Sequence, residues 1–327
     1  MRHEAHGALA DSSLLGDLDR EQLEELAPLT RPWRAVAGEL VLRQGEPGDR
    51  LLLVTSGRLG AFRRGPGGEE IDLGAIGPGE MVGELALLAG GRRIASTRAL
   101  EDSAGLSLSA QAFELLHLQT RPVAHAVVRR IGESALGRLR LVYETLAERL
   151  DDGDAGRQLL ITGDAGDSLV EVFPVAHTDV AYLARTLFFQ RFPTTEIEAA
   201  CAGLRVLSAP RGAPLQVDGR LWIVLRGAVE TLLDRGDARR RVRIAGPGRC
   251  VGHLGLLDDG APELPLVSAL RERAVLLELP IARARALMDG EDPWSRRFAD
   301  AFHVDVMHAA LAAETPQAPV IRHLPAA

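Results

Sequence analysis

Cysteine is scarce in this sequence, and lysine and asparagine are absent. The two cysteines, Cys201 and Cys250, are too few for a disulfide framework or a cysteine-held metal cluster. No apolar run reaches the roughly 18 residues that a membrane span requires. The N-terminus, MRHEAHGALADSS, lacks the apolar core of a secretion signal. These absences predict a cytoplasmic protein in a reducing compartment, without contact to a membrane.

Basic residues are outnumbered: 38 Lys and Arg stand against 45 Asp and Glu, a formal net charge of −7. A nucleic-acid-binding protein normally carries a basic surplus or a basic stripe. Motifs of kinases, of serine hydrolases with Gly-x-Ser-x-Gly and of metal-dependent enzymes are also missing. The sequence therefore predicts a protein that is not an enzyme, with no cofactor and no metal. It also disfavours DNA as a partner.

Internal repetition is the strongest structural signal in the chain. The segment Gly77–Leu88 (GPGEMVGELALL) recurs as Gly246–Leu257 (GPGRCVGHLGLL), and Ser56–Leu59 (SGRL) matches Arg226–Val229 (RGAV) with almost the same spacing. Further upstream a third block aligns three residues of each copy: Leu18, Leu23 and Gly38 with Phe192, Ile197 and Gly212. Because three separate blocks keep their order, the chain is predicted to contain two tandem copies of one domain.

Each copy is predicted to begin with a short helix, at Asp19–Leu26 and at Thr194–Ala202. Short apolar runs between glycines and prolines then indicate antiparallel strands of a roll or barrel. These runs are Glu39–Arg43, Leu51–Val54, Leu59–Arg63, Glu70–Leu73 and Ala104–Leu108 in the first copy, and Leu221–Leu225, Val229–Leu233, Val242–Ile244 and Ala274–Leu279 in the second. The predicted fold class is α+β, with two tandem antiparallel, jelly-roll-like β-rolls and flanking helices.

The pattern divides the chain into segments. We expect a disordered N-terminus over 1–13, the first roll over 14–121, a long helix over 122–150, a linker over 151–180, the second roll over 181–290, a C-terminal helix over 291–314 and a loose tail over 315–327. Apolar residues recur along the long helix at every third or fourth position: Val128, Ile131, Ala135, Leu139, Val142, Leu146 and Leu150. This stripe covers its own roll or forms a homodimer seam, and the sequence leaves both open.

One segment of the first copy has a more specific pattern. Val82–Thr97 reads VGELALLAGGRRIAST. It resembles the phosphate-binding cassette of cyclic-nucleotide-binding domains, which occur in catabolite-activator-type bacterial regulators and in regulatory subunits of cyclic-AMP-dependent protein kinases. The turns Arg43–Leu51 and Ser56–Leu59 are similar to earlier turns of that family. The resemblance extends over about Leu14–Leu150 and implies that the protein senses a cyclic nucleotide.

The resemblance implies a role for each residue of this cassette. Arg93 is the expected ligand of the cyclic phosphate, because a guanidinium presents a rigid fork of donors with a permanent charge. Glu84 is expected to accept a hydrogen bond from the ribose 2′-hydroxyl, and Gly83 lets the backbone approach the ligand closely. A short helix that starts near Leu85 would add backbone N–H donors. The alternative is an internal Glu84–Arg93 ion pair in an inactive relic.

Ile94 and Ala95 follow the arginine, and by resemblance they contribute backbone N–H groups. Family members often carry a small residue or Ser/Thr where Ile94 stands, and those selective for cyclic GMP typically use Thr. The implied ligand is therefore cyclic AMP rather than cyclic GMP. Arg92 replaces a common proline and is expected to be solvated.

The second copy departs from this pattern. His253 stands in place of the glutamate, and the acidic, proline-containing stretch Asp258–Pro265 stands in place of the arginine pair. Carboxylates around an anion site would repel a cyclic phosphate. The second copy is therefore predicted to keep the fold and to have lost the ligand. We interpret His253 as a surface or satisfied loop histidine rather than a metal ligand.

These patterns predict a non-enzymatic regulator that responds to a cyclic nucleotide and acts through contacts with an unidentified protein partner. Catabolite-activator-type regulators place a helix-turn-helix after the long helix, whereas this chain places a second roll there. The segment His177–Phe189 lacks a turn glycine and a basic recognition helix. Two alternatives remain: a transcription regulator with an unrecognised DNA-binding element, and a structural interaction protein without a ligand.

Overall fold

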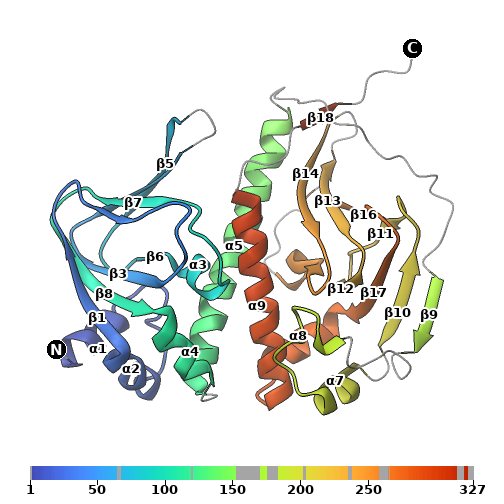
Figure 1. Ribbon diagram of the computed structural model, residues 1–327, viewed down its shortest axis with the longest axis horizontal. Coiled ribbons are helices and arrows are strands. Elements are labelled where there is room, and N and C mark those ends of the chain that lie inside the picture. The colour runs from blue at the N-terminus through green and yellow to red at the C-terminus, as the bar shows by residue number, and fades with distance from the viewer. Residues whose placement is uncertain are drawn as a thin grey trace. The chain divides into compact units, whose positions relative to one another are not determined.

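The structure is a computed structural model that describes residues 2–64, 68–118, 121–151, 170–174, 183–201, 204–234, 238–257, 264, 266–314 and 320–322. The chain forms two compact units, which we call the first domain (through Ala135) and the second domain (from Leu136). None of the described helices is both long and apolar enough to cross a bilayer. Each domain is a β-roll of two antiparallel sheets with helices (Figure 1).

The first domain begins with helices and continues as a roll. Its elements are α1 (Arg2–Ala10), α2 (Arg20–Leu26), a 3-10 turn (Ala27–Leu29), β1 (Thr30–Ala35), β2 (Leu40–Leu42), β3 (Arg50–Ser56), β4 (Leu59–Arg64), β5 (Glu70–Ile76), β6 (Met81–Val82), α3 (Glu84–Leu88), β7 (Ser96–Ala99), β8 (Ser103–Ser109), α4 (Ala110–Leu118) and α5 (Pro122–Asp151), which continues into the second domain. The predicted helix over 19–26 is confirmed. A capping box between Asp19 and Gln22 fixes its start.

The second domain repeats this plan. After the shared helix come β9 (Val170–Pro174), α7 (Thr194–Cys201), β10 (Arg205–Ala209), β11 (Pro214–Leu215), β12 (Arg220–Arg226), β13 (Val229–Asp234), β14 (Ala238–Ala245), β15 (Cys250–Val251), a 3-10 turn (His253–Leu256), β16 (Leu266–Leu270), β17 (Ala274–Pro280), α8 (Ile281–Asp289), α9 (Pro293–Glu314) and β18 (Val320–Arg322). The C-terminal helix ends where the sequence predicted, at Glu314.

The two rolls agree strand for strand. The first domain has sheets in the order β1-β8-β3-β6 and β2-β7-β4-β5, and the second has β10-β17-β12-β15 and β11-β16-β13-β14 in the corresponding places. Even the irregularities recur: the register shifts between Val54 and Ser56 in β3 and between Val224 and Arg226 in β12. The predicted fold class and the tandem repeat are thus confirmed.

Three parts of the predicted segmentation are wrong in detail. Arg2–Ala10 is helical rather than disordered, because Ala5 and Leu9 are buried and give the helix an apolar face. The expected linker contains β9, which pairs with β10, and the expected loose tail contains β18, which pairs with β14. Both strands extend the edge of a sheet and satisfy backbone groups there. Residues 152–169 and 175–180 of the linker and residues 315–319 and 323–327 of the tail lie outside the described part.

The apolar stripe of α5 is largely covered within the chain itself. Val128, Ile131, Ala135 and Leu139 are buried. Leu141, which is not part of the stripe, is exposed. The structure thus gives the stripe a role in the core, and a homodimer seam on it stays a prediction.

Gly105 provides a test of how tightly the first roll is packed. A Cβ at this position of β8 would lie 1.9 Å from the carbonyl oxygen of Leu53 and 2.9 Å from Trp33 Nε1. Neither atom can move freely, because Trp33 Nε1 donates to the carbonyls of Leu53 and Leu106 at 3.3 and 3.2 Å. We expect Gly105→Ala to lower the free energy of unfolding by about 1–3 kcal/mol in denaturant titrations.

The matched control is Gly137→Ala, because Gly137 lies in α5 and an added Cβ there meets nothing within 4 Å. This substitution should raise stability by up to about 1 kcal/mol, the difference in helix propensity between glycine and alanine. A Gly105→Ala protein as stable as the wild type would contradict the packing described for β8.

Candidate functional site

The cassette of the first domain is built around a buried guanidinium, that of Arg93. The turn before β3 fixes its backbone: the N–H of Arg93 donates to Glu46 O and the N–H of Gly45 donates to Arg93 O, both at 2.8 Å. Its side chain is 4% exposed, and Nη2 donates to Asp49 Oδ1 and to the carbonyl of Arg50, again at 2.8 Å. Asp49 belongs to the turn whose sequence resembles the family, but sequence reasoning gave it no role.

The second nitrogen of the same guanidinium is unsatisfied. Arg93 Nη1 is buried and has no hydrogen-bond partner among the described residues. Leaving a buried charged donor unpaired costs free energy, on the order of 1–3 kcal/mol or more. An anionic oxygen placed against Nη1 would remove that cost. The arrangement therefore fits a ligand that brings its own negative charge.

Gly83 lies directly against this nitrogen. Its φ of 87° is in the left-handed region, and a Cβ would stand 2.5 Å from Arg93 Nη1. Any other residue would be strained and would crowd the guanidinium. Glu84 begins α3 immediately after Gly83 and is 7% exposed, and Leu85 is 5% exposed and packs in the core. The structure thus places Gly83, directly before Glu84 and Leu85, against the Arg93 guanidinium.

The residues that follow Arg93 lead into β7. Ile94 and Ala95 are half-buried and connect the arginine to Ser96, the first residue of that strand. Arg92 is exposed, as expected, although its Nη1 also donates to Gly45 O at 2.7 Å. The six predicted site residues thus lie in two segments, Gly83–Leu85 and Arg93–Ala95, which meet where Gly83 lies against the Arg93 guanidinium.

Comparison with known proteins identifies this domain. The sequence profile of the "Cyclic nucleotide-binding domain" family matches residues 33–119. The "Cyclic AMP receptor protein" of Thermus thermophilus is 35% identical over 153 residues, which are 46% of this chain and 68% of that protein. The chain belongs to the cyclic nucleotide-binding domain family. The "cGMP-dependent protein kinase egl-4" of Caenorhabditis briggsae is 29% identical over 168 residues, 49% of this chain but only 22% of the kinase.

Solved structures give matches of two kinds. The N-terminal domain of a transcriptional regulator from Streptomyces coelicolor has 34% sequence identity and a TM-score of 0.36, and the match covers 39% of this chain and 91% of that one. The regulatory domain of Toxoplasma gondii PKA, solved with cAMP, has 18% identity and a TM-score of 0.34. That match covers 88% of this chain and 92% of the other.

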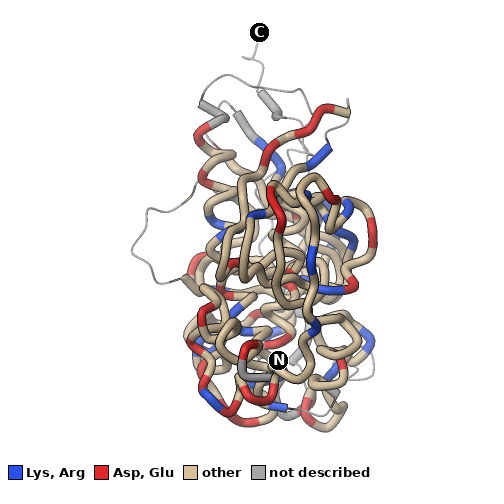
Figure 2. Tube along the Cα trace, turned by 90° about the vertical axis from the view of Figure 1, so that its left-hand side faces the viewer, with Lys and Arg blue, Asp and Glu red and all other residues tan. Residues whose placement is uncertain are grey.

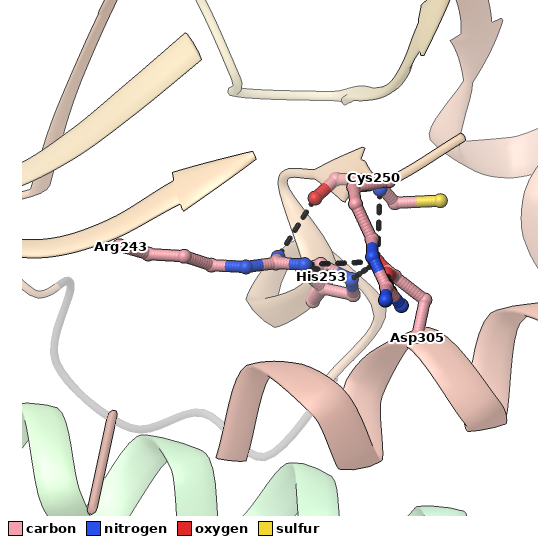
Figure 3. Close-up of polar contacts among 5 residues, drawn as sticks. Arg243, Cys250, His253 and Asp305 are labelled. Atoms are coloured by element: carbon pink, nitrogen blue, oxygen red, sulfur yellow. Dashed lines mark hydrogen bonds and ion pairs between the residues drawn. The ribbon is translucent and has the colours of Figure 1, made fainter. Parts of the chain in front are cut away.

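The second cyclic-nucleotide-binding-like roll differs from the expectation at His253. His253 is 5% exposed rather than at the surface, and its ring lies between Arg243 of β14 and Asp305 of α9 (Figure 3). The interpretation as a surface histidine is wrong, and the alternative of a satisfied histidine holds. Sequence spacing could not reveal this contact, because Asp305 lies far along the chain in a helix. The stretch 258–263 and residue 265 lie outside the described part.

Three side chains of this cluster could in principle hold a metal ion. The ligand atoms of Cys250, His253 and Asp305 lie within 4.8 Å of one another. However, the permanent charge of Arg243 already contacts two of these residues: Nη1 is 3.0 Å from His253 Nδ1, and Nη2 donates to Asp305 Oδ2 at 3.1 Å. Burial and Asp305 raise the pKa of the Cys250 thiol well above its usual value, and in Figure 3 its sulfur points away from His253 and Asp305. The arrangement disfavours a metal ion.

The buried histidine makes stability depend on pH. Burial and the Arg243 guanidinium, against the opposing effect of Asp305, hold the pKa of His253 below its usual value, and Arg249 adds to the lowering. The unfolded chain therefore binds a proton below about pH 6.5 that the folded domain excludes. We therefore expect the free energy of unfolding to decrease as the pH is lowered below this value. The decrease is about 1.4 kcal/mol per pH unit for one histidine that stays neutral in the folded domain.

Denaturant titrations at pH 7.5, 6.5 and 5.5 measure this slope. His253→Gln should flatten it, since glutamine cannot take up the proton. His308, whose pKa burial and Arg249 lower to about 4, contributes in the same direction, so His308→Gln is the matched comparison. A His253→Gln protein that kept the full slope would show that His253 is not the group responsible.

Proposed function

We propose that the protein is a non-enzymatic regulator whose first domain binds cyclic AMP through Arg93 and Glu84. The observation that carries this proposal is the buried Arg93 Nη1, which faces Gly83 and has no partner among the described residues. A cyclic phosphate would supply the missing acceptor and charge. Glu84 is the residue after Gly83, and its carboxylate is the proposed acceptor for the ribose hydroxyl.

Cyclic AMP is the purine nucleotide that we favour. The residue after the arginine is Ile94, which has no hydroxyl with which to contact guanine. The match covers 68% of the relative named as a cyclic AMP receptor protein. It covers only 22% of the cGMP-dependent kinase. Since these relatives continue beyond the matched part, their own outputs do not transfer directly.

We propose output through protein contacts rather than DNA. Acidic and basic residues are interspersed along the described trace (Figure 2), and the formal net charge is −7. Sequence-independent binding to DNA depends on neutralising phosphates with clustered basic residues. The competing hypothesis is a transcription regulator with a DNA-binding element outside the recognised motifs. A mobility-shift assay with DNA distinguishes the two.

A variant pair tests the ligand assignment. Arg93→Ala removes the fork at the candidate phosphate site, and the loss of a charge-assisted contact should weaken cyclic AMP binding by about tenfold or more. Arg92→Ala is the matched control, because Arg92 is exposed and its Nη1 donates to the backbone carbonyl of Gly45. Isothermal titration calorimetry of the full chain should give one site per chain.

Each outcome of that titration is informative. Equal affinities for Arg93→Ala and the wild type would remove Arg93 from the site. No binding by the wild type would favour the structural interaction protein without a ligand. A stoichiometry of two would contradict the loss of the ligand from the second copy.

We further propose that α5 transmits the state of the first domain. A ligand changes a conformational equilibrium only through its different affinity for two states, so an element must move when the site fills. β8 leads directly into α4, and α5 follows and continues past Ala135 into the second domain. This helix is therefore the covalent path along which a change at the cassette reaches the rest of the chain.

Hydrogen exchange tests this path. With cyclic AMP present, we expect altered protection both in the cassette and in the first turns of α5, from Pro122 to Ala135. The same experiment on Arg93→Ala provides the control and should show neither change. Protection changes confined to the cassette would show that α5 only covers its own roll.

A further inference from the structure

Among the described residues of the second domain, Asp305 accepts hydrogen bonds from four donors. It lies on α9, and its carboxylate is 3% exposed. Oδ2 accepts from the backbone N–H of Cys250 at 2.8 Å, from Arg243 Nη2 at 3.1 Å and from His253 Nε2 at 2.8 Å, while Oδ1 accepts from Arg249 Nη1 at 3.2 Å. Figure 3 shows the side chains of Arg243 and His253 extending toward Asp305. We call these five residues the Asp305 network.

The chemistry of the donors fixes the protonation of the network. A guanidinium cannot accept a hydrogen bond, so His253 Nδ1, at 3.0 Å from Arg243 Nη1, must be the unprotonated acceptor. His253 Nε2 then carries the hydrogen and donates to Asp305. Although burial acts to raise the pKa of Asp305, Arg243 and His253 outweigh it and hold that pKa well below its usual value. The carboxylate is therefore an anion.

Besides Asp305, the groups that affect the pKa of Arg243 are Tyr143 and Cys250, and neither supplies a negative charge. Burial raises the pKa of the Tyr143 hydroxyl to about 12 and keeps it protonated, and the Cys250 thiol is likewise protonated. Arg243 is 8% exposed, and a buried guanidinium without an anion would be strongly destabilising. The negative charge of Asp305 is thus what allows Arg243 to be buried.

The network occupies the place of the cassette in the second roll. Gly252 has a φ of 95° and precedes the buried His253, just as Gly83 with a φ of 87° precedes the buried Glu84. β15 pairs with β12 before this turn as β6 pairs with β3. The arginine, however, comes from a different element, β14 rather than the segment after the short helix. The arginine that donates to the anion therefore reaches this turn from a different element than Arg93 does in the first roll.

We propose that the second roll keeps an anion-binding site of its own and fills it with the Asp305 carboxylate, a built-in ligand that holds α9 on the roll. The chemical class that fits the donors is a small oxyanion, because one backbone N–H, one imidazole N–H and two guanidinium groups point at the two oxygens of a carboxylate. This domain is thus held in its liganded state by its own sequence and does not respond to a free nucleotide.

Chemical rescue tests the site without any nucleotide. Asp305→Ala removes the carboxylate and leaves the donors, so its midpoint of thermal unfolding should fall below that of the wild type. Sodium formate, whose carboxylate can replace the deleted group, should raise the midpoint saturably, and sodium chloride at equal ionic strength should not. The matched control is Leu276→Ala, which opens a cavity in the core of the same roll and removes no charge.

The wild type provides the baseline, because it contains the Arg93 site unchanged and any formate effect of the first domain appears there too. The result is therefore independent of whether the first domain binds cyclic AMP. Equal formate and chloride curves for Asp305→Ala, or equal formate shifts in Asp305→Ala, Leu276→Ala and the wild type, would overturn the proposal.

A second variant covers the case in which Asp305→Ala does not fold in plain buffer. The double variant Arg243→Leu with Asp305→Ala removes both charges, and replacing a buried pair with apolar groups is often tolerated. We expect it to be more stable than Asp305→Ala alone and insensitive to formate. A formate shift that persisted without Arg243 would place the anion elsewhere and overturn the assignment.

Discussion

A buried guanidinium that needs an anion is the constraint on which both halves of this protein depend. Burying a charge is tolerated only where opposite charge and hydrogen bonds replace the lost water. The first roll buries Arg93 and satisfies one of its two terminal nitrogens with Asp49 and a carbonyl. The second roll buries Arg243 and surrounds Asp305 with donors. The first copy therefore still lacks an anion for one guanidinium nitrogen, whereas the second copy supplies the anion from its own chain.

This difference arises on a common scaffold. Both rolls have the same strand order, a register shift at the same place in the corresponding strand, and a left-handed glycine before the short helical turn. At Gly83 a side chain would collide with Arg93, and at Gly252 it would collide with the carbonyl of Arg220. Both turns therefore need glycine for backbone reasons, whether glutamate or histidine follows it. Fold and ligand chemistry are separable here.

The proposed division of labour follows from these electrostatics. A domain with an unsatisfied donor gains free energy when an anion binds, so its conformational equilibrium can respond to the concentration of that anion. A domain whose anion is part of its own chain has nothing to gain from a free ligand. The first roll is thus suited to sensing, and the second to presenting a fixed surface. The helix α5, which belongs to both domains, connects the two.

The sequence by itself determined the repeat and the α+β roll, and it pointed to the candidate residues of the first cassette. Local signals sufficed for these: glycine-rich turns at matching places, short apolar runs and a segment in which Gly83, Glu84 and Arg93 lie close along the chain. The helical N-terminus and the edge strands β9 and β18 were missed, because they form through pairing and packing with distant residues. Only the tertiary structure decided the second site. Arg243, His253 and Asp305 come from a strand, a turn and a helix, and no spacing in the sequence records that their charges meet.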